Sequence, residues 1–189
     1  MSTTYVALIR GVNVGHASRV AMADLRDLFD RLGYADVHTV LNSGNVIFRA
    51  PVHGGDDARD VTSLLAADIS TALESDLGVS AKVIVLEGAQ VASSVEEDPL
   101  AGIATDPSRL LFAFVASPSD LYRLRPLIEQ DWEPETLALG QQVAYLWCPN
   151  GMVASRLAQA VARILGDDVT FRNATTVAKV RAAVQDVDG

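Results

Sequence analysis

Apolar residues recur along the chain with two periods, and the change from one period to the other marks the predicted elements. The run YVALI, residues 5–9, is rich in strand-forming residues and predicts a strand that ends before a glycine. Apolar residues then recur every three or four positions between Met22 and Leu32, which predicts a helix ended by Gly33. The runs VHTVL and VIFRA flank NSGN, so residues 37–50 predict a β-hairpin with a two-residue Ser-Gly turn.

A second helix and one more strand complete the first half of the chain. The helix is predicted to begin in an Asp-rich segment at residues 56–60 and to end at Gly78. The run AKVIVL, residues 81–86, predicts the strand. The apolar face of the helix is predicted to consist of Leu64, Leu65, Ile69, Leu73 and Leu77.

The second half repeats the order strand, helix, strand, strand, helix, strand. A connector with a short helix near residues 88–95 precedes it. The helix before the last strand has a predicted apolar face of Val153, Leu157, Val161, Ile164 and Leu165. The predicted elements are a strand at 110–116, a helix at 119–130, a hairpin of TLAL and QVAYLWC around Gly140, that helix ended by Gly166, a strand at 168–171 and a closing helix at 174–185.

Two consecutive βαββαβ units predict an α+β fold of two tandem ferredoxin-like subdomains with an extra C-terminal helix. The predicted boundaries are 1–87 for the first subdomain, 88–109 for the connector and 110–189 for the second subdomain with the helix. Because crossovers between parallel strands are right-handed, the exit of the first strand and the first hairpin turn should share one sheet end. RGVN is therefore expected beside NSGN.

Three segments, YVALIRGVNVG, VLNSGNVIF and VTFRNATTVAKV, in this order, resemble the bacterial family called domain of unknown function 1697. The resemblance covers nearly the whole chain and implies two ferredoxin-like subdomains, but no activity. The family commonly has glycine where His16 stands, glutamine where Asn42 stands and tryptophan where Ala174 stands. If that tryptophan is a stacking surface for a ligand, this chain lacks it; if it is core packing, a neighbour must fill the volume.

Charge and cysteine content narrow the classes of function. Lys and Arg number 15 against 24 Asp and Glu, a net charge of −9, so the average field repels polyanions and anionic membranes. The single cysteine, Cys148, excludes an intramolecular disulfide and reads as a small apolar filler. No secretory signal or membrane span is visible, so we expect a soluble cytoplasmic protein. No histidine pair has metal-ligand spacing, and EEDP at 96–99 reads as a solvated acidic loop, so we expect no metal and no cofactor.

The segment RGVNVGHASR matches neither the dinucleotide nor the mononucleotide phosphate loop. It still offers a glycine-permitted bend before a helix N-terminus, where arginines can approach an anion. Structural alternatives remain: tight turns for both loops, a helix N-cap for Asn173 with Thr176 at the third position, and a salt bridge for Arg172. The candidate ligand-binding residues are Arg10, Asn13, Arg19, Asn42, Ser43 and Asn45, with Arg172, Asn173 and Lys179 joining if the subdomains pack to allow it.

No catalytic set of recognisable spacing is present, which favours a binding protein over an enzyme. The leading hypothesis is a small anionic ligand at the end of the first sheet. The first alternative is an interaction or regulatory module that acts as a homodimer through open sheet faces or edges. Single-stranded nucleic acid is the least favoured, because only Tyr5 and Phe48 are candidates for stacking on the first sheet and the charge is wrong.

Overall fold

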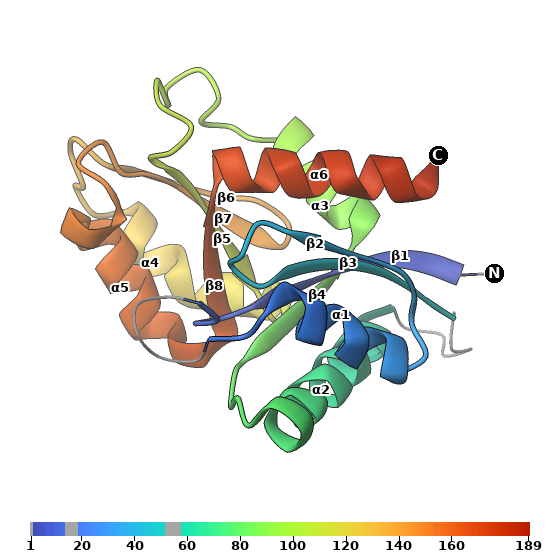
Figure 1. Cartoon of the computed structure of the whole chain (residues 1–189). Helices are drawn as coiled ribbons and strands as arrows, with labels where there is room; N and C mark the ends of the chain where they lie inside the picture. Colours follow the sequence, from blue (N-terminus) through green and yellow to red (C-terminus); the bar gives the residue numbers. More distant parts are fainter. Residues whose placement is uncertain (1, 14–18, 52–57) are drawn as a thin grey trace. The chain divides into compact units, whose positions relative to one another are not determined.

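The computed structural model describes residues 2–13, 19–51 and 58–189 (Figure 1). The chain forms two compact units, which we call unit 1 (Met1–Val91 with Lys179–Gly189) and unit 2 (Ala92–Ala178). The fold is mixed α+β, and the described residues form two four-stranded antiparallel sheets. The subdomain boundaries expected from the sequence remain a prediction.

Unit 1 is built on a sheet with the strand order β2-β3-β1-β4, in which all neighbouring strands are antiparallel. Leu8 lies opposite Asn45 and Ile9 opposite Val83, so the end of β1 and the starts of β3 and β4 meet at one sheet end. The elements follow the predicted order: β1 (Ser2–Ile9), α1 (Met22–Arg31), β2 (Ala35–Val40), β3 (Asn45–Pro51), α2 (Ala58–Leu77) and β4 (Val83–Glu87).

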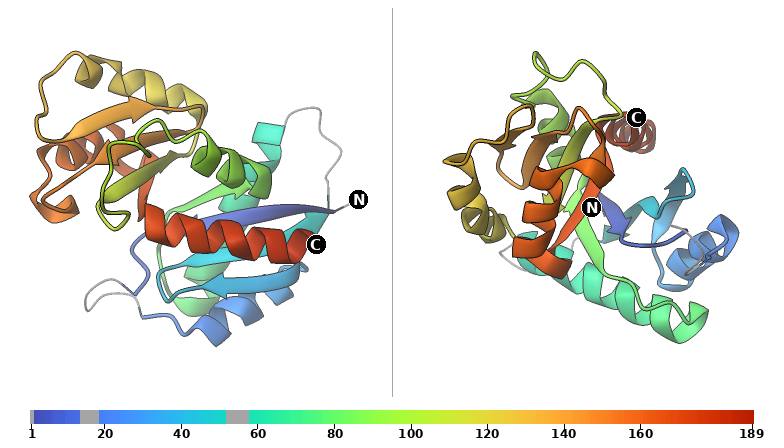
Figure 2. Two further views of the ribbon diagram at one scale, coloured as in Figure 1. Left: turned by 90° about the horizontal axis from the view of Figure 1, so that it is seen from above. Right: turned by 90° about the vertical axis from the view of Figure 1, so that its left-hand side faces the viewer.

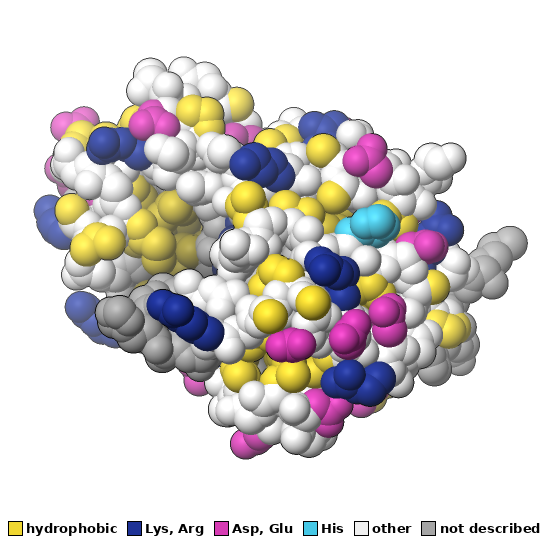
Figure 3. Space-filling view, in the orientation of Figure 1, with side chains coloured by type: hydrophobic (Ala, Val, Ile, Leu, Met, Phe, Trp, Pro, Cys, Tyr) yellow, Lys and Arg dark blue, Asp and Glu magenta, His cyan; other side chains and the backbone are white. Residues whose placement is uncertain are grey.

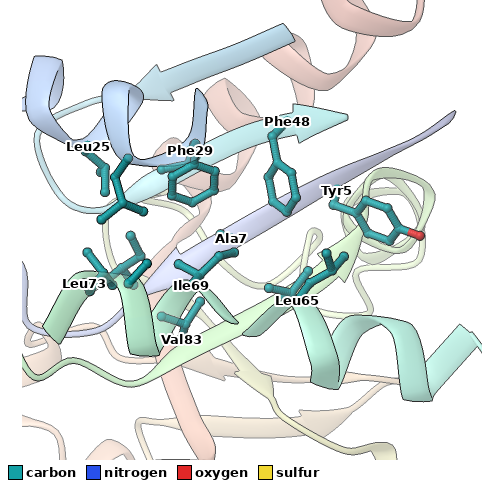
Figure 4. Packing of buried hydrophobic residues seen from close by; sticks show 14 of the residues in the cluster. Tyr5, Ala7, Leu25, Phe29, Phe48, Leu65, Ile69, Leu73 and Val83 are labelled. Carbon is teal, nitrogen blue, oxygen red and sulfur yellow. The ribbon is translucent and has the colours of Figure 1, made fainter. Parts of the chain in front are cut away.

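The core of unit 1 lies between one face of this sheet and the helices α1 and α2 (Figure 4). Alternate residues of β1 point to the helices, because side chains along a strand alternate between its faces. Phe29 from α1 meets Phe48 from β3 edge to face, with ring centroids 5.2 Å apart. Leu65, Ile69 and Leu73 of α2, spaced by four residues, close the cluster from the other side.

The opposite face of the same sheet carries the C-terminal part of α6 (Ala174–Asp188) (Figures 1 and 2). The Thr4 hydroxyl donates to Asp188 Oδ1 at 2.6 Å, and Arg49 donates to the backbone oxygen of Val187. Val184 packs so closely on Gly88 that a Cβ there would lie 2.7 Å from its Cγ1 atom. A helix on each face explains why β1 is buried continuously from Thr4 to Ile9.

Unit 2 has a sheet with the order β6-β7-β5-β8, again with antiparallel neighbours. Its core lies between one face of the sheet and helical segments that include α5, which contributes Leu157, Val161 and Leu165. After α3 (Gly88–Glu96), its elements are β5 (Leu110–Val115), η1 (Pro118–Leu124), α4 (Arg125–Ile128), β6 (Thr136–Leu139), β7 (Val143–Trp147), η2 (Met152–Ala154), α5 (Arg156–Leu165), η3 (Gly166–Asp168) and β8 (Val169–Asn173), followed by α6.

The prediction of one continuous helix at 119–130 is wrong. The segment forms the 3₁₀ helix η1 and then the single turn α4. Pro126 would stand inside the predicted helix, where it lacks the backbone N–H for the bond to residue 122 and clashes with that carbonyl. The chain therefore ends one helix and begins another, with the proline in the first turn of α4.

Two side chains assigned to apolar helix faces are exposed instead. Val153 is 94% exposed in η2, because Ser155 caps α5 by accepting the Ala158 backbone N–H at 2.8 Å and the helix begins only at Arg156. Leu64 is 61% exposed on α2. It stands one position, about 100° of helical rotation, away from the buried row of Val61, Leu65, Ile69 and Leu73.

Candidate functional site

The turn end of the first sheet comprises residues 9–13, the turn 41–44, Asn45 and residues 82–83. The Ile9 backbone N–H donates to the Gly44 oxygen at 2.8 Å, and the Arg10 N–H donates to the Lys82 oxygen at 2.9 Å. The prediction that RGVN lies beside NSGN is therefore confirmed. Gly15 and His16 of the same loop lie outside the described residues.

Asn13 holds the loop to its neighbours with its side-chain amide. Its Nδ2 donates to the backbone oxygens of Val20 and Asn42, each at 2.9 Å, and its Oδ1 accepts the Val20 N–H at 2.9 Å. Asn13 also has φ +57°, a left-handed conformation that asparagine tolerates better than most residues. Asn13 thus closes the loop and fixes it against the hairpin turn.

The hairpin turn is not the two-residue Ser-Gly turn that we predicted. Val40 pairs with Asn45, so the turn has four residues, and its positive φ values fall on Leu41 (+58°) and Gly44 (+71°). A Cβ at Gly44 would lie 2.9 Å from the backbone oxygen of Ile9, so the glycine is also required for the close approach of β1. The pattern NSGN spreads over the turn and the first residue of β3.

Asn45 has a structural role. It is fully buried, and its Nδ2 donates to the Val40 oxygen and to Ser43 Oγ, each at 3.0 Å. Buried amides without such partners would destabilise the fold, because desolvated polar groups need hydrogen bonds. Asn45 and Ser43 therefore stabilise the turn, while the exposed Asn42 side chain stands at its outer edge.

Three exposed cationic side chains surround these pinned loops: Arg10, Arg19 and Lys82. The Arg10–Lys82 backbone bond places two of them side by side, and the Asn13–Val20 bonds bring Arg19 back to the same end. Lys82 was missed from the sequence. The strand order already implied its position, because the start of β4 must meet the end of its antiparallel neighbour β1.

The three candidate ligand-binding residues near the end of the chain, Arg172, Asn173 and Lys179, belong to different units. Arg172, on β8, donates to Thr170 Oγ1 and to the Phe171 oxygen, each at 2.8 Å, and burial lowers the pKa of its guanidinium to about 10. Asn173 Oδ1 accepts the Thr176 N–H at 2.9 Å, so the predicted N-cap is confirmed. Lys179 is exposed in unit 1, whereas Arg172 and Asn173 belong to unit 2. A site that combines all three with Arg10 remains a prediction.

Other residues that could have taken part in catalysis or binding are buried in the hydrophobic cores. Cys148 is fully buried beside Ser155 Oγ, and burial raises the pKa of its thiol to about 11, which agrees with a core filler and not with a nucleophile. Tyr5 and Phe48 are buried under α1 and α2, so neither is presented to a nucleic-acid base. Within residues 2–13, 19–51 and 58–189, no three His, Cys, Asp or Glu side chains are grouped to hold a metal ion.

The charges on the visible surface are mixed. On the face shown in Figure 3, Lys and Arg side chains lie singly among acidic and neutral groups. An extended polyanion needs a continuous basic stripe, because its affinity comes from many phosphate contacts. Among the residues drawn in colour on this face, the Lys and Arg side chains form no such stripe.

These features define a two-unit α+β protein whose first sheet ends in pinned polar loops with exposed cations. The chain belongs to the family described as Protein of unknown function (DUF1697), whose model matches residues 2–145. A solved structure described as that of the conserved bacterial protein SP0830 from Streptococcus pneumoniae has a similar fold. The two structures superpose with a TM-score of 0.76 and 22% sequence identity, and the match covers 97% of this chain and 99% of that chain. At this identity the likeness concerns the fold and not a function.

No curated protein matches the chain. No helix in the described part of the chain combines the length and apolar character needed to cross a membrane.

Proposed function

We propose that the chain binds a small anionic ligand at the turn end of the first sheet, through Arg19, Lys82, Arg10 and the exposed Asn42. The observation that carries this proposal is the gathering of exposed cations there on a chain of net charge −9. Asn13 and Asn45 act as positioning residues, since their amides hold the two loops in place.

A contrast with four other arginines supports the proposal. Arg31, Arg49, Arg109 and Arg123 each form an ion pair with an aspartate. Among the residues that the structure describes, Arg19 and Lys82 form no such pair. Two cations left without carboxylates on an acidic chain, held on loops tied by backbone bonds, are suited to a ligand with several anionic oxygens.

Calorimetric titration with inorganic pyrophosphate at constant ionic strength tests this function. We expect saturable binding that weakens about tenfold or more in Arg19→Met/Lys82→Met, because each charge-assisted hydrogen bond contributes about 1.5–3 kcal/mol. Arg163→Met removes an equally exposed cation from α5 in unit 2 and should leave the affinity unchanged. The same titration with citrate shows whether the site binds carboxylates as well as phosphates. Absence of saturable heat with both probes, or equal affinity in the double variant, contradicts the proposal.

We also propose that the two units are ferredoxin-like subdomains that arose by duplication. Support comes from the shared strand order and from two matching backbone bonds. In unit 1, Ile9 and Arg10 donate to the oxygens of Gly44 and Lys82. In unit 2, the Val115 N–H donates to the Gln142 oxygen and the Ala116 N–H donates to the Asp168 oxygen. An experimental structure with α1 and α2 on opposite faces of the first sheet, or with η1 and α5 on opposite faces of the second, would contradict this.

A further inference from the structure

A groove of about 380 Å³ lies in unit 2, beside η1 and the turn between β6 and β7. Its volume is within the range of small-molecule sites. Leu121 and Leu139 supply apolar surface, and the Tyr122 ring is 63% exposed. The groove is lined by Pro118, Leu121, Tyr122, Arg125, Leu139, Gly140 and Gln141.

Arg125 is the one charged residue in this lining. Its guanidinium carbon lies 4.6 Å from the centroid of the Tyr122 ring, a cation–π contact that holds the side chain at the groove. Within the described part of the chain, Arg125 has no ion pair. Its neighbour Arg123 differs, because it is bound to Asp120 at 3.2 Å and to Asp168 at 3.0 Å.

The turn beside the groove has a defined shape. The Gly140 N–H donates to the Val143 oxygen at 2.8 Å, and a Cβ at Gly140 would lie 2.9 Å from Cε2 of the Tyr145 ring. Ser117 and Asp120 form a capping box that fixes the start of η1 on the other side. Both walls are therefore ordered by local bonds before any ligand binds, which lowers the entropic penalty of binding.

We propose that this groove binds a small carboxylate that carries a flat apolar body. The apolar body packs against Leu121, Leu139 and the Tyr122 ring, and the carboxylate accepts hydrogen bonds from Arg125. A guanidinium suits a carboxylate because its planar set of donors matches two oxygens at once. One cation in an apolar lining favours a ligand with a single negative charge. The groove differs in this from the site proposed at the end of the first sheet, where several cations favour a ligand with several anionic oxygens.

The position of the groove within its own unit supports a ligand role. It lies where the first strand of the sheet ends and where the hairpin turn begins, as the Val115–Gln142 and Ala116–Asp168 bonds indicate. In unit 1 the same position is occupied by the pinned loops with Arg10 and Lys82. Each unit thus has exposed positive charge at the same end of its sheet, Arg10 and Lys82 in unit 1 and Arg125 in unit 2, with different surroundings.

Amide NMR titration of the full chain with phenylacetate, and with phenylacetamide as the uncharged match, tests this inference. We expect phenylacetate to shift the amide signals of Tyr122, Gly140 and Gln141 in a saturable way. Phenylacetamide should bind about tenfold more weakly, because it lacks the charge that Arg125 meets. Arg125→Met should weaken phenylacetate to the same extent, whereas Arg163→Met should leave it unchanged.

Both substituted side chains are exposed, so the variants are expected to fold, and their unshifted amide spectra away from the groove check this. Equal binding of the acid and the amide would overturn the inference, and so would unchanged phenylacetate affinity in Arg125→Met. Saturable shifts confined to Asn42 and Lys82 would also overturn it and would support the first site instead. Failure of pyrophosphate binding at the first site leaves the phenylacetate result unaffected, so the two proposals are tested separately.

Discussion

The connection that leaves the first strand differs sharply between the two units. In unit 1, residues 10–21 separate β1 from the regular helix α1. In unit 2, only Ala116 and Ser117 separate β5 from the 3₁₀ helix η1. The chain needs extra length to form polar loops at a sheet end, and unit 1 has it. The short connection of unit 2 instead brings η1 against the hairpin turn and leaves an apolar groove there.

The charges at matched positions differ as well. Lys82 accepts the backbone bond from the end of β1, and its side chain is an exposed cation. Asp168 accepts the corresponding bond from the end of β5, and its carboxylate is used by Arg123. The same backbone pattern can therefore support a cationic site in one unit and an internal ion pair in the other. Backbone geometry determines where a site can lie, and side chains determine what it can bind.

The largest loss of stability is expected when a core side chain is removed from the helix that follows the first strand of each unit. Phe29→Ala in α1 should lower the free energy of unfolding by about 3–5 kcal/mol, because Phe29 is fully buried and leaves a cavity beside Phe48. Leu121→Ala in η1 should reduce it by about 2–3 kcal/mol, since Leu121 borders the groove and the site can relax. Urea unfolding of both variants measures the difference. A larger loss for Leu121→Ala would break the comparison.

A smaller loss is expected at the hairpin turn of unit 1. Gly44→Ala places a Cβ 2.9 Å from the Ile9 oxygen at φ +71°, so we expect about 3 kcal/mol of destabilisation. Gly33→Ala is the matched control, because Gly33 has φ +80° with no atom within 4 Å of the added Cβ. It should lose about 1 kcal/mol from backbone strain alone. Equal losses, measured by thermal unfolding, would show that the contact with β1 contributes nothing.

The Asn13 amide should contribute less than the glycine contact. Asn13→Ala removes three hydrogen bonds at a half-buried position, for an expected loss of about 1–2 kcal/mol of stability. Asn42→Ala changes only an exposed side chain and should stay within about 0.5 kcal/mol of the parent. Hydrogen exchange at the Val20 amide should increase in the first variant alone. Unchanged exchange there would contradict the pinning role of Asn13.

The last comparison, an alkaline titration of one tyrosine in each unit, is expected to leave stability at neutral pH unchanged. Burial raises the pKa of Tyr34 in unit 1 and of Tyr145 in unit 2 from 10.0 to about 12. Since the folded state holds these protons more tightly, stability is unaffected below pH 10 and falls as the pH rises from 10 towards 12. Burial raises the pKa of Tyr5 as well, so phenolate absorbance should show three late-titrating groups, one of which disappears in Tyr145→Phe. The exposed Tyr122→Phe is the control.

Much of the fold could be predicted because its signals are local. The helix ended by Gly33 and the hairpin at 37–50 follow from periodicity and glycine positions. The error at 119–130 came from giving no weight to Pro126, and the wrong placement of Val153 on a helix face came from missing Ser155 as a cap. Both errors concern where helices start and stop, which depends on single residues rather than on period.

The candidate site could be predicted only in part. Strand order correctly brought the Arg10 loop beside the hairpin turn, and the same order could have placed Lys82 there. The roles of Asn13 and Asn45 could not be predicted, because they depend on which carbonyl each amide reaches in the folded chain. The groove at Arg125 was beyond prediction for the same reason, since it arises from a 3₁₀ helix packed beside a turn.

The most direct test of the central claim is an amide NMR titration of the whole chain with inorganic pyrophosphate. The account predicts saturable shifts at Arg19, Asn42 and Lys82, with the groove residues Tyr122 and Gly140 unchanged, and loss of those shifts in Arg19→Met/Lys82→Met. Shifts that are absent from the turn end of the first sheet, or that persist there in the double variant, would contradict it.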